Sequence, residues 1–97
     1  DAQNASSKTA LHLAAKKGHK EVVGLLINRQ CTIDAKDQYS NTPLHGGAMN
    51  GHCDIVELLI NHGAAVDGQN EILRTALHLA AEKGHKEVVD LLLNHGA

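Results

Sequence analysis

Apolar residues recur along this chain at intervals of three and four residues, in short stretches separated by polar segments. The first stretch places Leu11, Ala14 and Ala15 on one helical face, because positions i, i+3 and i+4 lie on the same side of an α-helix. The second stretch has similar spacing, and its apolar members are Val22, Val23, Leu25 and Leu26. The pattern predicts two short helices, over residues 10–17 and 20–29, followed by a polar, turn-like segment.

This helix pair is one of three copies with a period of 33 residues. Residues 75–94 agree with residues 9–28 at seventeen of twenty positions, and residues 42–61 agree with them at eleven. A fixed period of this length is typical of repeat proteins, in which each copy covers the apolar face of the next. We therefore expect first helices over 10–17, 43–50 and 76–83, and second helices over 20–29, 53–62 and 86–95.

The residue types at the ends of the first helices support these bounds. Each first helix is preceded by a threonine, whose hydroxyl can accept a backbone N–H at an N-cap; the three are Thr9, Thr42 and Thr75. Pro43 stands at a first helical position, where its missing N–H costs nothing. Each first helix is followed by a glycine, which accepts the left-handed conformation of a C-terminal cap; these are Gly18, Gly51 and Gly84.

The motifs Thr-Ala/Pro-Leu-His, Gly-His, Val-Val/Ile-Val, Leu-Leu and His-Gly-Ala occur at fixed offsets over essentially the whole chain. In length and motif the unit resembles the ankyrin repeat. The resemblance implies an all-α fold, an ankyrin-type α-solenoid of stacked helix-turn-helix repeats joined by β-hairpin-like loops. We expect one domain over residues 1–97, with repeats at about 4–36, 37–69 and 70–97.

Neither end of the chain carries a distinctly polar helix pair. Repeat arrays usually need polar terminal units that hide the apolar end faces. We therefore expect a segment of a longer array, or one that associates end to end with itself through its uncapped terminal repeats.

Composition narrows the functional classes. A net charge of −2 is too small for a nucleic-acid binder that acts by bulk charge, and one Tyr without Trp or Phe provides no base-stacking platform. No apolar run approaches the about 18 residues of a membrane span, so we expect neither nucleic-acid binding nor membrane insertion. Cys31 and Cys53 are too few for a disulfide scaffold. We interpret them as buried thiols in a reducing compartment, the cytoplasm or the nucleus.

Eight histidines raise the question of a metal site. They recur at repeat positions, so equivalent histidines lie about 10 Å apart on packed helices, whereas zinc ligands converge to about 2 Å from one ion. The resemblance implies that the first histidine of a repeat exchanges hydrogen bonds with the capping threonine and the second holds the neighbouring loop. The H-E-x-x-H, P-loop and G-x-S-x-G motifs are absent, so we expect no enzyme activity, cofactor or metal.

Because framework positions are used for stacking, function is expected where the copies differ. The resemblance places such positions at the turn tips and on the exposed face of the first helix, which together line a concave groove. Carried over residue by residue, it predicts a site for a protein or peptide partner formed by Lys8, Lys16, Lys17, Lys36, Gln38, Tyr39, Asn41, Met49, Asn50, Glu71, Ile72, Arg74, Glu82 and Lys83. The same positions include Ala5, Ser6 and Gln69.

Three of these residues favour binding by their own chemistry. Tyr39 is the only aromatic residue, and tyrosine is frequent among interface anchors. Met49 offers an adaptable thioether, and Ile72 is expected to be an exposed apolar residue. The lysines of the first repeat suit a partner with an acidic segment. The alternative function is a structural spacer within a longer array, with binding elsewhere.

Two departures from the repeat pattern concern the backbone. Gly46-Gly47 replaces Leu-Ala, and a glycine inside a helix costs up to ~1 kcal/mol relative to alanine. We therefore expect the middle repeat to be the least stable. Three explanations of the glycine pair stay open: a neutral loss of stability, a cleft or a hinge. Ser7, Ser40 and Leu73 stand at a turn position where the family usually has glycine; a bulky Leu73 is the hardest to accommodate if φ is positive there.

Overall fold

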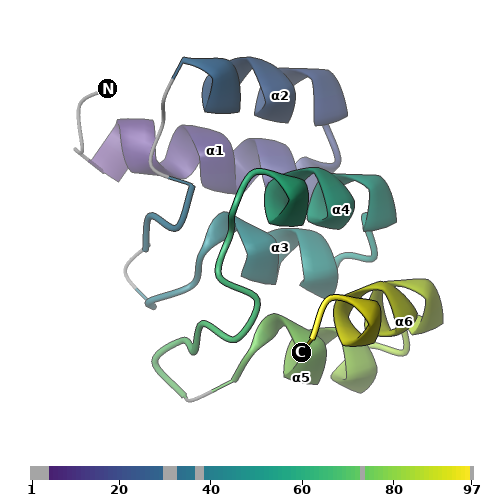
Figure 1. The fold of residues 1–97 in the computed structure, drawn as a ribbon. Helices are drawn as coiled ribbons and strands as arrows, with labels where there is room; N and C mark the ends of the chain where they lie inside the picture. Colours follow the sequence, from purple (N-terminus) through teal and green to yellow (C-terminus); the bar gives the residue numbers. More distant parts are fainter. Residues whose placement is uncertain (1–4, 30–32, 37–38, 73, 97) are drawn as a thin grey trace.

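A computed structural model of the chain describes residues 5–29, 33–36, 39–72 and 74–96, with residues 5–9 described by their backbone alone. The described residues form six helices, drawn in Figure 1. Their bounds are α1 Ala5–Lys17, α2 Lys20–Asn28, α3 Pro43–Met49, α4 Cys53–Asn61, α5 Ala76–Glu82 and α6 Lys86–Asn94. Five of them agree with the predicted ranges to within one residue at each end, and α1 begins earlier.

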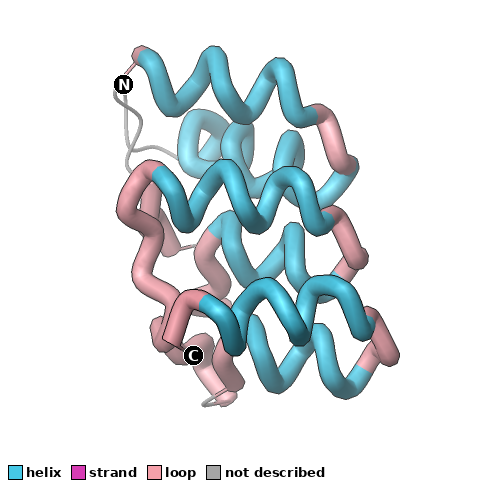
Figure 2. The backbone as a smooth tube through the Cα atoms, turned by 45° about the vertical axis from the view of Figure 1, so that its right-hand side comes forward, coloured by secondary structure: helices cyan, strands magenta, loops and turns pink. Residues whose placement is uncertain are grey.

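The six helices form three antiparallel pairs stacked side by side. The first helices α1, α3 and α5 pack in one row, and the second helices α2, α4 and α6 pack in a second row (Figures 1 and 2). Short turns join the two helices of each pair at one side, and long loops join successive pairs at the other (Figure 2). This arrangement confirms the predicted all-α solenoid.

The predicted N-caps of the first helices are confirmed in the second and third copies, at α3 and α5. The Thr42 hydroxyl accepts the backbone N–H of His45, and the His45 ring in turn accepts the backbone N–H of Thr42 at 3.0 Å. Thr75 and His78 repeat this reciprocal arrangement at the start of α5. The glycines that follow the first helices have φ values of 80, 75 and 77°, at Gly18, Gly51 and Gly84.

The prediction for the start of the first copy is wrong. Helix α1 begins at Ala5, so Ala5, Ser6 and Lys8 are helical rather than a turn tip, and Thr9 lies inside the helix rather than at its N-cap. Residues 5–8 contain neither Gly nor Pro, and Ala10 stands where Pro43 stops the equivalent helix from extending backwards. Thr9 is a possible N-cap, but no helix-breaking residue beside it prevents the helix from beginning earlier.

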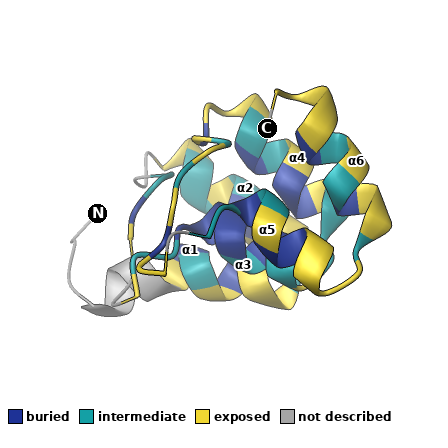
Figure 3. Ribbon diagram, turned by 90° about the horizontal axis from the view of Figure 1, so that it is seen from below, coloured by how far each residue is buried: buried dark blue, intermediate teal, exposed yellow. Residues whose placement is uncertain are grey.

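The core lies between the two rows of helices, where buried residues concentrate in Figure 3. Leu44, Ile55 and Leu59 of the middle copy are at most 1% exposed. Val22 occupies the position of Ile55 in the first copy, yet it is 46% exposed. The difference arises because this face of Ile55 is covered by the preceding copy, whereas α2 has no copy before it in the described residues.

The loops between copies are hairpin-like without containing a strand in the residues that the structure describes. The Asn70 N–H donates to the Arg74 carbonyl at 3.0 Å, which closes the loop between α4 and α5. Ser40 has a φ of 63°, so the loop between α2 and α3 adopts the left-handed conformation expected where the family has glycine. Leu73 lies outside the described residues, and Ser7 belongs to α1.

Candidate partner-binding groove

Histidines on the first helices fix the loop that follows each copy. The backbone N–H of Thr42 can only donate, so Nδ1 of His45 accepts and the ring proton lies on Nε2. That Nε2–H donates to the Arg74 carbonyl at 2.9 Å, in the loop of the next copy. His12 makes the equivalent bond to the Asn41 carbonyl at 2.8 Å. The loop that carries the predicted tip residues is thus attached to the preceding helix.

The histidines before α4 and α6 bond to the preceding copy, whereas those on the first helices bond to the following one. Nε2–H of His52 donates to the Lys16 carbonyl at 2.8 Å, and Nε2–H of His85 donates to the Met49 carbonyl at 2.9 Å. The family resemblance implied that the second histidine holds a loop. The structure places the accepting carbonyls of Lys16 and Met49 in the last turns of α1 and α3, next to the short turns that follow these helices.

Adjacent loops are also joined to one another. The Glu71 N–H donates to the Tyr39 carbonyl at 2.9 Å, and the Asn70 side-chain amide donates to Oδ1 of Asn41 at 2.9 Å. Oδ1 of Asn70 accepts the backbone N–H groups of Ile72 and of Arg74, each at 3.0 Å. These bonds hold Tyr39 and Ile72 at neighbouring tips while both side chains stay exposed, at 54% and 65%.

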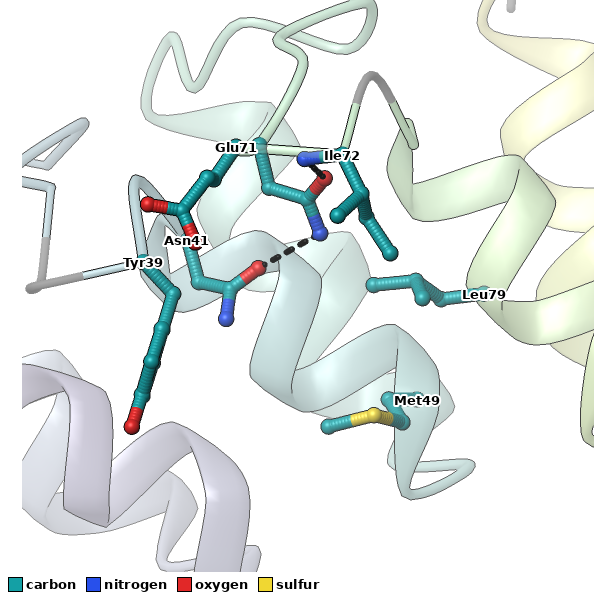
Figure 4. A pocket seen from close by; sticks show the side chains of 7 residues that line it. Tyr39, Asn41, Met49, Glu71, Ile72 and Leu79 are labelled. Atoms are coloured by element: carbon teal, nitrogen blue, oxygen red, sulfur yellow. Dashed lines mark hydrogen bonds between the residues drawn. The ribbon is translucent and has the colours of Figure 1, made fainter.

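A first cavity of about 270 Å³ opens between the α2–α3 loop and the α4–α5 loop. Figure 4 shows the side chains of Ile72 and Leu79 pointing toward one another, with Met49 on the adjacent helix and Tyr39 at the far side. Leu79 is only 7% exposed and forms the floor. The full lining is Tyr39, Asn41, Met49, Asn70, Glu71, Ile72 and Leu79.

A second cavity of about 200 Å³ lies beside the first, toward α1. Its lining is His12, Lys16, Tyr39, Asn41, Thr42, Gly46 and Met49. Tyr39, Asn41 and Met49 line both cavities, so the two are adjacent, and we call the pair the tip groove. Each cavity is smaller than the about 300–1,000 Å³ typical of small-molecule sites, so the tip groove suits side chains of a polypeptide.

The structure brings together six of the predicted site residues in the tip groove. These are Lys16, Tyr39, Asn41, Met49, Glu71 and Ile72. Lys17, Lys36, Asn50, Glu82 and Lys83 are exposed but line neither cavity. Arg74 also lines neither and forms an ion pair with Glu82 at 3.8 Å. Gln38 and the side chain of Lys8 lie outside the described residues.

Sequence reasoning missed several residues of the tip groove. Leu79, His12 and Thr42 recur in equivalent copies and were assigned to the framework, but the groove also uses their surfaces. Asn70 was missed because its buried side chain organises the loop rather than projecting from it. The one available signal was its position, directly before the predicted tip residue Glu71.

Within the described ranges, no three His, Cys, Asp or Glu side chains are grouped so that they could hold a metal ion. None of the described helices combines the length and apolar character needed to span a membrane. Cys53 is a half-buried free thiol, and Cys31 lies outside the described residues.

Cys53 is expected to react slowly with alkylating reagents. Burial raises the pKa of this thiol, and the carboxylates of Glu87, Glu57 and Asp54 raise it further, so the reactive thiolate is scarce at neutral pH. In a Cys31→Ser variant, the alkylation rate by iodoacetamide should rise with pH around a higher midpoint in the native protein than in urea. Equal midpoints would contradict this. The pKa of the thiol is higher in the folded state than in the unfolded state. Its contribution to the free energy of unfolding is therefore fully present below the unfolded-state pKa and is lost as pH rises through the folded-state pKa.

The chain was compared with protein-family models and with curated proteins. A model described as ankyrin repeats, in three copies, matches residues 1–70 and 35–97. The chain belongs to the ankyrin repeat family. No curated protein matches the chain.

Family membership sets the general function. Ankyrin repeats are generally protein–protein interaction modules and are typically non-enzymatic. In this ankyrin chain, Thr42, His45 and His52 are engaged in a cap and in bonds between copies. The side chains of Tyr39 and Ile72 are exposed at the neighbouring loop tips.

Proposed function

We propose that this ankyrin repeat chain binds a peptide segment of another protein in the tip groove and catalyses no reaction. The observation that carries the proposal is the pair of adjacent cavities that share Tyr39 and Met49 in their linings. Exposed Tyr39 and Ile72 flank the groove, and large apolar or aromatic side chains around a depression are the usual anchors of a protein interface.

A display library of random 12-residue peptides, selected on the wild-type chain, tests the proposal. Enriched peptides are expected to lose at least tenfold in affinity for a Tyr39→Ala/Met49→Ala/Ile72→Ala variant, because alanine removes side chains that line the tip groove. Fluorescence anisotropy with the synthesised peptides measures the dissociation constants. A circular dichroism melt shows that the variant retains its fold.

A matched control removes apolar surface at another place. Val22 and Leu25 are 46% and 54% exposed on α2, and neither lines the tip groove. A Val22→Ala/Leu25→Ala variant is therefore expected to bind the selected peptides within twofold of wild type. If this variant loses binding while the triple groove variant retains it, the proposed site is wrong.

A second candidate function is a structural spacer that contacts a further repeat or a second copy of the chain through the α2 end face. Ile55 and Val88 are fully buried, whereas Val22 at the equivalent position is 46% exposed. An exposed apolar face of this kind is suited to stacking of another repeat. Sedimentation of the wild type and of Val22→Ala/Leu25→Ala tests the contact with a second copy, which requires self-association of the wild type that the variant weakens.

A further inference from the structure

One residue of the tip groove is much smaller than the residues at the same position of the other two copies. Gly46 occupies the position of Leu13 and Leu79. In the third copy, Leu79 forms the floor of the first cavity (Figure 4). In the middle copy, Gly46 lines the second cavity with no side chain at all. The second cavity therefore lies where the repeat pattern would place a leucine side chain.

We infer that Gly46 determines specificity by leaving a notch in the tip groove, which receives an acidic side chain of the bound peptide next to Lys16. The inference rests on the proposed function and adds the chemistry of the partner.

The backbone gives no reason for a glycine at this position. The φ angle of Gly46 is not positive, so the backbone does not need a glycine there. A Cβ atom added there would lie 3.7 Å from Cβ of Lys16 and 3.9 Å from the His12 carbonyl oxygen, which is ordinary van der Waals contact. Glycine is also less favourable than alanine or leucine inside a helix. Gly46 is thus a disfavoured helix residue that neither its φ nor a Cβ contact requires, and it lines a cavity, so we infer that the empty space is used.

The neighbouring glycine does not share this environment. A Cβ atom on Gly47 would lie 3.4 Å from Cγ2 of Ile55 and 3.5 Å from Cγ2 of Val56, both fully buried. Gly47 lines neither cavity of the tip groove. The two glycines therefore have separate roles, and Gly47 serves as a matched control for Gly46.

Charge selects an acidic side chain for the notch. Lys16 lines the second cavity, and the one ion pair in the described part of the chain joins Arg74 to Glu82. The Lys16 ammonium thus has no carboxylate partner there. At the other end of the tip groove, Glu71 lines the first cavity and disfavours a carboxylate. An acidic side chain is therefore favoured near Lys16.

The apolar first cavity fixes the second feature of the peptide. Ile72, Leu79 and Met49 suit a large aliphatic or aromatic side chain. Neighbouring first helices lie about 10 Å apart, and an extended chain advances about 3.3 Å per residue. We therefore expect an acidic residue and a large apolar residue about three positions apart.

Peptides enriched on the wild-type chain from the random 12-residue library provide the probe. They are expected to share this pair of residues. Their affinity should fall at least tenfold for Gly46→Leu, which fills the notch, and severalfold for Lys16→Gln, which also removes most of the salt dependence. Gly47→Ala should bind within twofold of wild type. Gly46→Leu is expected to melt no lower than wild type, so its weaker binding cannot be attributed to unfolding.

The outcomes separate this inference from the proposed function. Wild-type affinity in Gly46→Leu, or enriched peptides without a shared acidic residue, overturns the notch while the loss of binding in the triple groove variant still supports the proposed site. Retention of binding by the triple groove variant overturns the proposed site itself. Equal loss in Gly46→Leu and Gly47→Ala also overturns the notch, because Gly47 does not line it.

Discussion

Replacing His45 with alanine is expected to lower the free energy of unfolding by about 3 kcal/mol, since it removes a cap and leaves buried polar groups unpaired. The His45 ring accepts the Thr42 N–H and donates to the Arg74 carbonyl, and the residue is 2% exposed. Its loss therefore weakens both the start of α3 and the contact with the third copy. Urea denaturation followed by circular dichroism measures the change.

His78 provides the matched control for this experiment. It forms the same capping box with Thr75, but it is exposed and the described residues contain no following copy for its ring to contact. We expect His78→Ala to cost about 1 kcal/mol, the usual value of a cap. The difference between the two variants reports the bond between copies and the burial of His45. Equal destabilisation would show that this bond contributes nothing.

Replacing Gly51 with alanine is expected to cost about 3 kcal/mol, from a left-handed backbone and from crowding. Gly51 has a φ of 75°, and a Cβ atom there would lie 2.8 Å from Nδ1 of His85. The ring would have to move, although its Nε2–H is bonded to the Met49 carbonyl. Thermal and urea denaturation should both show a less stable protein.

The equivalent glycine of the third copy separates the two causes. Gly84 has a φ of 77°, and a Cβ atom on it would meet nothing within 4 Å. We expect Gly84→Ala to cost only about 1 kcal/mol, from the backbone alone. If Gly51→Ala and Gly84→Ala are equally destabilised, the close approach of His85 to Gly51 contributes no energy.

Sequence periodicity predicted most of this fold because each helix boundary is a local property. Thr42, Pro43 and Gly51 specify the ends of α3 through their own chemistry, and the structure agrees. The start of α1 was predicted wrongly by analogy with the other copies. Residues 5–8 contain neither Gly nor Pro, and Ala10 replaces the proline of the middle copy, so a capping threonine alone did not fix the start of the helix.

The candidate site was less accessible from the sequence, because its shape depends on contacts between copies. Tyr39, Met49 and Ile72 were predicted from their chemistry, and the structure places them around one depression. The part played by Leu79 was hidden, since a recurring leucine indicates packing rather than a cavity floor. The consequence of Gly46 was equally hidden, because a helix glycine by itself does not reveal whether the space beside it is filled.

The histidine bonds run in both directions across each junction, forward from His45 to Arg74 and backward from His85 to Met49. The first junction repeats the pair through His12 and His52. Each boundary is thus joined by two bonds, one between residues 29 apart and one between residues 36 apart, and equivalent bonds recur every 33 residues. The array can consequently be lengthened or shortened by whole 33-residue units with both histidine bonds re-formed at every junction.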